Sequence, residues 1–239
     1  MSSSVYHISY LHLLWISIPV GIVIYIFIRW SMGVSAILHG LARMLIQLIL
    51  IGYALHYIFA ANQPLIVLAI LCFMLGAASI IALRPLSRKR KSLYLKTFAA
   101  ISLGSILTLV IVTQGVLTLA SWFEPRYIIP LAGMIFANSM NAVSIGAERF
   151  EVEYSREKNY ESARAYAFRA SLIPIINSLY AVGLVSLPGM MTGQILSGIS
   201  PLIAARYQIM VMCMVLGSAG ISSALYLMFL KKELAEIPR

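Results

Sequence analysis

Residues 64–83 read PLIVLAILCFMLGAASIIAL, and this stretch decides the class of fold. It contains no charged side chain, and its length is about the 20 residues that an α-helix needs to cross the hydrocarbon core of a bilayer. Pro64 stands at the first turn, where a missing N–H costs little. Because a segment in lipid must satisfy all its backbone polar groups internally, the stretch predicts a transmembrane helix.

The composition of the whole chain points the same way. Of its 239 residues, 61% are apolar or aromatic and only 11% are charged, and the mean hydropathy is +0.90. Soluble globular proteins carry about 25% charged residues. These values exclude a soluble globular protein, and they exclude disorder as well. Since no linker and no repeat divides the sequence, we expect one transmembrane domain over residues 1–239.

Seven apolar segments follow one another and predict an all-α, polytopic membrane protein. They are about 9–28, 44–60, 64–83, 97–121, 127–146, a segment from near 170 that is interrupted at Pro188-Gly189, and about 205–230. Segment 31–43, which carries His39 and Arg43, is expected to lie partly at the membrane interface before it runs into the second span.

The placement of charge orients these spans. With the N-terminus outside and the C-terminus inside, all but two of the 18 Lys and Arg residues, Arg126 and Arg206, fall in cytoplasmic stretches. Positive residues favour that side, so the pattern supports seven spans in this orientation. The run Arg88-Lys89-Arg90-Lys91 then anchors two spans to anionic headgroups, at about 1 kcal/mol per cation. We therefore expect the lipid bilayer as a partner and no nucleic acid.

Motifs for catalysis are missing from the sequence. There is no G-x-x-x-x-G-K-[ST] phosphate loop, no H-E-x-x-H, no close Cys/His cluster, and no Asp or Glu inside a span. The eight acidic residues are all glutamate. We expect no catalytic residue, no cofactor on this chain, and a protein that is not an enzyme.

Residues 147–169 form the one hydrophilic segment of useful length, and they predict a short cytoplasmic helix. The pairs Arg149/Glu153 and Glu161/Arg164 have the i,i+4 and i,i+3 spacings of ion pairs on a helix. Two interpretations stay open: a solvated helix on the membrane surface, or a helix that docks onto a cytoplasmic partner. In the second interpretation, the coupling residues are Glu153, Arg156, Glu157, Glu161 and Arg164.

Several polar side chains lie inside the predicted spans, where they either hold helices together or line a path. The segment LVSLPGMMTGQILSG, residues 184–198, is a second candidate for such a path, because Pro188 and Gly189 break a helix there. It is either a gate or a kinked helix packed through Gly189 and Gly193. The candidate path and gate residues are Arg43, Gln47, Asn138, Asn141, Asn177, Pro188, Gly189, Met190, Met191, Gly193 and Gln194.

Several blocks between about residues 40 and 230 carry a family resemblance. They are Leu172-Ile173-Pro174, 182–198 with Leu187-Pro188-Gly189-Met190-Met191-Thr192-Gly193, Pro201, Tyr207-Gln208-Ile209, Ala42-Arg43, Gln47-Leu48, Gly52-Tyr53, Ile58-Phe59, and 129–134 with Asn138 and Met140. In these blocks the sequence resembles the FetB-type permeases, membrane subunits of ABC transporters that include bacterial iron exporters and plant aluminium-tolerance proteins.

The resemblance implies a permease of the inner (plasma) membrane that exports iron or another metal. It also implies a homodimer and a separate ATP-binding ABC subunit that docks on 147–169. Many members carry Leu-Gly-Ala-Thr where this chain has Glu153-Tyr154-Ser155-Arg156, so the docking residues stay open. Met134, Met140, Met190 and Met191 are the candidate metal contacts.

Two alternatives to metal export remain open from the sequence. One is a permease for a sugar nucleotide or another organic solute, for which Arg43 and Arg206 would supply the cationic contacts. The other is a passive channel or structural membrane protein that works without an ATPase.

Overall fold

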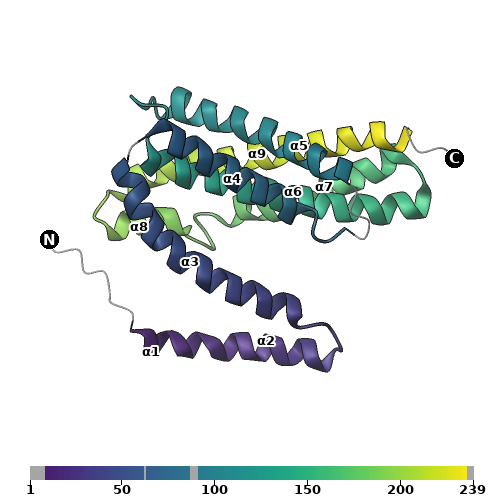
Figure 1. Ribbon diagram of the computed structural model, residues 1–239, viewed down its shortest axis with the longest axis horizontal. Coiled ribbons are helices and arrows are strands. Elements are labelled where there is room, and N and C mark those ends of the chain that lie inside the picture. The colour runs from purple at the N-terminus through teal and green to yellow at the C-terminus, as the bar shows by residue number, and fades with distance from the viewer. Residues whose placement is uncertain (1–8, 62, 87–90, 236–239) are drawn as a thin grey trace. The chain divides into compact units, whose positions relative to one another are not determined.

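The computed structural model describes residues 9–61, 63–86 and 91–235, and all regular elements in these ranges are helices (Figure 1). The only bridge between extended residues in these ranges joins Val182 to Ser186 inside a turn. The chain forms two compact units, Met1–Ala61 and Asn62–Arg239. The all-helical class is confirmed, whereas the single domain over 1–239 stays a prediction. Residues 88–90 of the basic run lie outside the described ranges.

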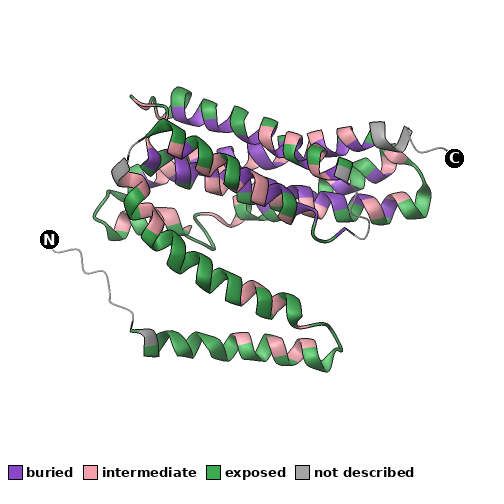
Figure 2. Ribbon diagram, in the orientation of Figure 1, coloured by how far each residue is buried: buried purple, intermediate pink, exposed green. Residues whose placement is uncertain are grey.

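The first unit consists of helices whose apolar side chains point outward. Helix α1 (Tyr10–Leu13), the 3₁₀ turn η1 (Leu14–Ile16) and α2 (Ser17–Arg29) follow one another without a gap, and α3 spans Ser35–Ala61. No described residue of this unit is buried, as Figure 2 shows. Helix α3 continues as one helix of 27 residues, so most of the expected segment 31–43 runs into the second span without a break, while its place at the membrane interface stays a prediction.

The second unit holds the protein core. Its elements are α4 (Pro64–Ala82), α5 (Lys91–Val110), the π-helix η2 (Ile111–Val116), α6 (Pro125–Glu157), α7 (Tyr160–Ala181), α8 (Gly189–Leu196) and α9 (Pro201–Ala235). The closest packing is of α5 and α6 on α9 and of α6 on α7. Ile101, Ile135 and Tyr226 are fully buried in this unit.

Small residues allow the helices of this core to approach at backbone distance. A Cβ placed on Gly104 of α5 would lie 2.4 Å from Oγ and 2.9 Å from the backbone nitrogen of Ser222 in α9. A Cβ on Gly146 of α6 would lie 3.1 Å from the Oγ of Ser223. The Ser223 hydroxyl in turn shares a hydrogen bond of 2.8 Å with Ser171 of α7. Small residues and hydroxyls at helix contacts are typical of packing in membranes, where lipid offers no hydrophobic driving force.

Six helices of the described residues are long and apolar enough to cross a membrane. They are Leu11–Arg29, Ser35–Phe59, Pro64–Ala82, Ser92–Val116, Pro125–Glu157 and Pro201–Lys231. Each corresponds to one of the seven predicted segments. The remaining segment, expected from near 170 to Pro188, belongs to α7, whose first half is polar and which is not among the six.

The break in that segment lies earlier than Pro188. Helix α7 already ends at Ala181, and the carbonyl of Ala181 accepts from the N–H groups of Leu184, Val185 and Ser186 in a tight turn. Gly183 adopts a φ of +83° in this turn, a value that a side chain would disfavour. Pro188 is therefore the N-cap residue that precedes α8, and it does not interrupt α7.

Candidate functional site

Helices α6 and α7 form an antiparallel hairpin whose tip is the two residues Lys158 and Asn159. Lys158 closes α6 in the left-handed conformation, with φ of 51°, and donates its N–H to the carbonyl of Tyr154 at 3.0 Å. The Asn159 side chain caps α7 by accepting from the N–H groups of Glu161 at 3.0 Å and Ser162 at 3.2 Å. The predicted segment 147–169 is therefore no separate short helix: it is shared between two long helices because its charges pair along each helix.

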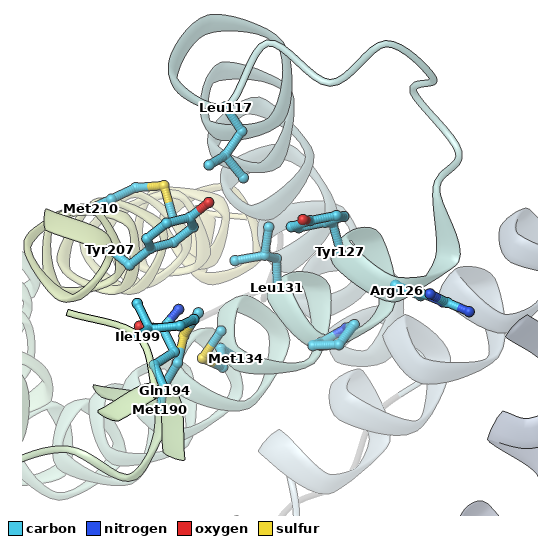
Figure 3. Close-up of a pocket in the computed structure, with 11 residues that line it drawn as sticks. Leu117, Arg126, Tyr127, Leu131, Met134, Met190, Gln194, Ile199, Tyr207 and Met210 are labelled. Atoms are coloured by element: carbon cyan, nitrogen blue, oxygen red, sulfur yellow. The ribbon is translucent and has the colours of Figure 1, made fainter. Parts of the chain in front are cut away.

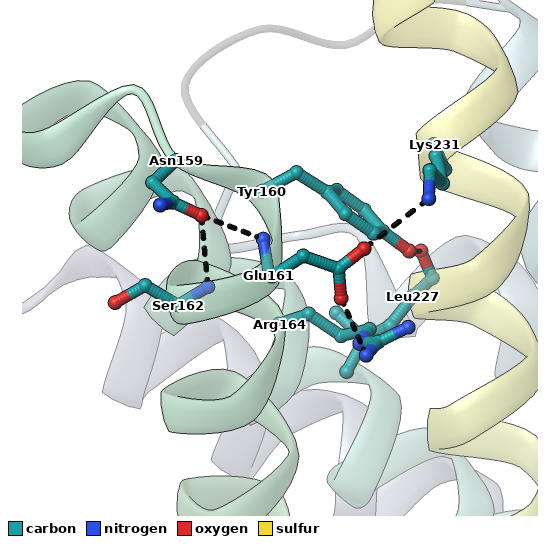
Figure 4. Close-up of polar contacts among 7 residues, drawn as sticks. All are labelled: Asn159, Tyr160, Glu161, Ser162, Arg164, Leu227 and Lys231. Carbon is teal, nitrogen blue, oxygen red and sulfur yellow. Dashed lines mark hydrogen bonds and ion pairs between the residues drawn. The ribbon is translucent and has the colours of Figure 1, made fainter.

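A polar cluster ties this tip to α9 (Figure 4). The Glu161 carboxylate binds Arg164 at 2.5 Å and reaches across to Lys231 of α9 at 3.2 Å. The Tyr160 hydroxyl donates to the carbonyl of Leu227 in α9 at 2.9 Å. The Tyr160 ring lies near both cations, 5.5 Å from the Arg164 guanidinium and 5.3 Å from the Lys231 ammonium.

Most of the predicted coupling residues form ion pairs or hydrogen bonds with other residues of this chain. Glu153 is buried and pairs with Arg149 at 2.5 Å and with Arg156 at 4.0 Å. Glu157 accepts from the Ser162 hydroxyl at 2.7 Å. The two predicted ion pairs, Arg149/Glu153 and Glu161/Arg164, are thus confirmed, and their glutamates stabilise the hairpin. The apolar surface left open near the tip is provided by Val152 and Tyr166, which are 46% and 49% exposed.

The second unit contains an open cavity of about 430 Å³ beside the first turns of α6, α8 and α9 (Figure 3). It is lined by Leu117, Arg126, Tyr127, Pro130, Leu131, Met134, Met190, Gln194, Ile199, Tyr207 and Met210. Three of these, Met134, Met190 and Gln194, are among the residues that the sequence predicted. Residues that follow the break before α8 and a residue of the predicted fifth span therefore line the same cavity.

Leu117 reaches the cavity from the end of a π-helix. In η2 the backbone pairs residues five apart, and the N–H of Leu117 donates to the carbonyl of Val112 at 2.9 Å. The next residue, Thr118, has a φ of 47°. Single turns of π-helix are frequent at functional sites, so the distorted end of α5 supports a functional role for this cavity.

Other predicted path residues lie elsewhere. Asn138 donates its side-chain amide to the Met134 carbonyl of its own helix at 2.8 Å, while Asn141 and Asn177 are exposed. Arg43 and Gln47 are exposed on α3 of the first unit.

Several other predicted site residues do not line the cavity either. Pro188, Met140 and Met191 are not among the lining residues, and neither are the two glycines of the expected packing motif. A Cβ on Gly189 or Gly193 would meet nothing within 4 Å in the described structure, so no helix of the described residues packs closely there, and packing through these glycines stays a prediction. Gly104 and Gly146 make the close approaches instead.

Sequence reasoning missed several residues of the cavity. Arg126 carried a signal, since it is one of only two cations that the charge pattern leaves outside. Tyr207 lies in a block that supports the family resemblance. Pro130 lies in another such block, 129–134, whereas Tyr127 and Met210 gave no signal, because their position depends on how α6 and α9 pack.

The described residues offer no ligand cluster for a resident metal. Within them, no three His, Cys, Asp or Glu side chains come together. Three methionines, Met134, Met190 and Met210, supply the only sulfur atoms at the cavity. Thioethers are soft, uncharged ligands, so they suit soft ions better than hard ones.

Comparison with known sequences decides the family. The sequence pattern of the "Uncharacterised protein family (UPF0014)" matches residues 10–163 and 154–235. The chain belongs to the UPF0014 family. Together with the six apolar helices, this membership makes the chain a multi-pass integral membrane protein.

Relatives within the UPF0014 family come from bacteria and plants. The chain is 38% identical to the UPF0014 membrane protein slr1647 of Synechocystis, over 73% of each chain. It is 35% identical to the "Probable iron export permease protein FetB" of Escherichia coli, over 85% of this chain and 80% of the relative. It is 33% identical to "Protein ALUMINUM SENSITIVE 3" of Arabidopsis thaliana, over 78% and 72%. The suspected family is confirmed, and no solved structure matches the chain.

Proposed function

We propose that this chain is the membrane-spanning permease subunit of an ABC transporter that exports iron or another metal. The observation that carries the proposal is the extended similarity to the Escherichia coli protein named as a probable iron export permease. The chain carries no phosphate loop, so ATP hydrolysis takes place on a separate ATP-binding subunit. The permease works as a homodimer in the inner (plasma) membrane, and this chain is itself no enzyme.

The membrane topology consists of seven crossings with the N-terminus outside and the C-terminus in the cytoplasm. Helix α6 has 33 residues and α9 has 35, so at 1.5 Å per residue both are about 50 Å long and exceed a hydrocarbon core of about 30 Å. Both therefore extend into the cytoplasm at their charged ends. The apolar half of α7, residues 170–181, is too short to cross alone, and the turn and α8 complete that crossing.

The tip of the α6–α7 hairpin serves as the docking element for the ATP-binding subunit. Force applied to it reaches α9 through the Glu161–Lys231 ion pair and the Tyr160–Leu227 hydrogen bond. At its other end α9 contributes Tyr207 to the cavity. The two conformations of the permease must bind the ATP-binding subunit with different affinity, because a partner that binds both equally shifts no equilibrium.

The docking test uses Val152 and Tyr166, because they are exposed and their side chains make no hydrogen bond, ion pair or ring contact within the described residues. Reversing Glu157 and Glu161 would also loosen the hairpin and would mix two effects. We expect the double variant V152R/Y166R to lose co-purification of an ATP-binding subunit while its thermal unfolding stays unchanged. The control R206E changes an exposed residue at the opposite end of α9 and should capture the subunit as the wild type does.

Two results would contradict this proposal in separate ways. If V152R/Y166R captures and stimulates the ATP-binding subunit normally, the hairpin tip is not the docking element. If the wild-type protein captures no such subunit, the assignment to an ABC transporter fails. The alternative of a passive channel or structural membrane protein without an ATPase is then favoured. The metal cargo is tested in cells that lack this chain, where intracellular iron should rise; unchanged iron and unchanged peroxide tolerance would count against metal export.

A further inference from the structure

The cavity is lined by one charged residue, Arg126, whose charge is positive; Figure 3 shows its guanidinium extending away from the other labelled lining side chains. Arg126 lies at its edge, is exposed, and forms no ion pair within the described residues (Figure 3). No lining residue is acidic. The acid nearest in sequence, Glu124, precedes α6 and is not among the lining residues. The electrostatic environment of the cavity therefore favours an anion.

The backbone adds to this preference. Three of the lining residues lie in the first turn of a helix: Arg126 and Tyr127 in α6, and Met190 in α8. Helix N-termini carry partial positive charge and unpaired N–H groups, which attract anions. No side chain caps the N-terminus of α6 or of α8.

The remaining lining atoms suit an apolar body with a few polar groups. Leu117, Leu131 and Ile199 form an aliphatic wall, and the rings of Tyr127 and Tyr207 offer aromatic surface. The Oε1 atom of Gln194 is buried without a hydrogen-bond partner, so it can accept from a ligand. A volume of about 430 Å³ lies within the roughly 300–1,000 Å³ of small-molecule pockets.

A bare iron ion does not suit this cavity. Hard cations bind carboxylate, carbonyl and water oxygens, and the cavity supplies no carboxylate. The three methionine thioethers carry no charge to offset that of a multivalent ion, and Arg126 repels it. A dehydrated cation would be left without compensation for its lost hydration.

We propose that the cavity binds an organic anion with an apolar or aromatic body through Arg126, and that a metal ion enters it only inside the chelate of such an anion. The second half rests on the proposed function, since it assumes a metal cargo. The free anion and its metal chelate both offer the cavity a negative charge and an apolar or aromatic body. The experiment therefore has to distinguish them by the presence of the metal.

The test measures binding to the purified full chain in lipid nanodiscs, without any ATP-binding subunit. The probes are 2,3-dihydroxybenzoate, its Fe(III) complex, and Fe(II) alone under anaerobic conditions. We expect saturable binding of both anionic probes. R126Q should weaken that binding at least about tenfold, the lower range for a hydrogen bond to a charged group. R126K should retain part of it, and E124Q should strengthen it.

Matched variants separate this site from others. R206Q removes the other outside cation, which does not line the cavity, and should leave binding unchanged. M134L/M190L removes two thioethers of the cavity wall at similar volume and serves only to test whether a bare metal ion binds to sulfur. Thermal unfolding of R126Q equal to that of the wild type shows that its loss of binding is local.

The possible outcomes decide each half of the proposal. Equal binding by R126Q and the wild type, or no anion binding at all, overturns the anion site. Saturable Fe(II) binding that M134L/M190L abolishes overturns the exclusion of bare metal. Binding of the free anion without its Fe(III) complex overturns the chelate half alone. Because no ATP-binding subunit is present, none of these results depends on whether the ABC assignment is correct.

Discussion

Replacing Gly104 by alanine tests how closely α5 and α9 pack. The added Cβ would lie 2.4 Å from the Ser222 Oγ, 2.9 Å from its backbone nitrogen and 3.2 Å from its Cα. Overpacking of a core typically costs about 1–3 kcal/mol, and replacing glycine within a helix returns about 0.5–1 kcal/mol. Since part of the clash is with backbone, we expect G104A to lower the free energy of unfolding by about 1–2 kcal/mol.

The assay is fluorescence-detected thermal unfolding in one detergent, with G76A as the matched control. Gly76 also lies inside a helix, but a Cβ there meets nothing within 4 Å, so G76A should unfold at the same temperature as the wild type or higher. The double variant G104A/S222G removes the Oγ contact but leaves the backbone contact at 2.9 Å, and it should recover only part of the loss. If G104A is as stable as G76A, or if S222G restores full stability, the backbone contact between α5 and α9 is not the cause.

Two further predictions concern the hairpin tip. N159A removes the side-chain cap of α7 and should cost about 1 kcal/mol in thermal or denaturant unfolding, whereas N159D keeps an acceptor oxygen and should cost less; equal losses in the two variants would contradict the capping role. Y160F removes the 2.9 Å hydrogen bond to the Leu227 carbonyl but keeps the ring near Lys231, so it should cost about 0.5–1.5 kcal/mol and make the tip more sensitive to limited proteolysis. Cleavage of Y160F at the wild-type rate would show that this bond does not hold the tip on α9.

Hydropathy located the helices well because the requirement for about 20 apolar residues is set by the bilayer and not by the rest of the fold. Segments such as 64–83 agree with the observed α4 almost residue for residue. The same reasoning ended the fifth span near 146, whereas α6 continues to Glu157. Charges mark where a helix leaves lipid, but they do not end it, since Arg149 and Glu153 stabilise each other along the helix.

The residues of the cavity were harder to predict, because they depend on which faces of the helices pack against one another. Single residues with unusual chemistry, such as Met190 and Gln194, were found through the break that they follow. Arg126 was placed outside by the charge pattern, but nothing in the sequence assigned it to a cavity. The expected contact at Gly189 and Gly193 was drawn from spacing alone, and spacing does not say whether a neighbouring helix is present.

The π-helix at the end of α5 sets the direction of the last side chains of this helix, up to Leu117 at its C-cap. An α-helix turns by about 100° per residue, so one residue more or fewer there would rotate the next side chains by about that angle. Leu117 lines the cavity at the end of η2, where the wider π-helical turn contains one more residue than an α-helical turn. Shortening 111–116 by one residue would leave α5 packed on α9 as before, yet it would aim a different side chain at the cavity wall. Insertions and deletions at this turn are therefore a route by which relatives could reshape what the cavity accepts without altering the helical core.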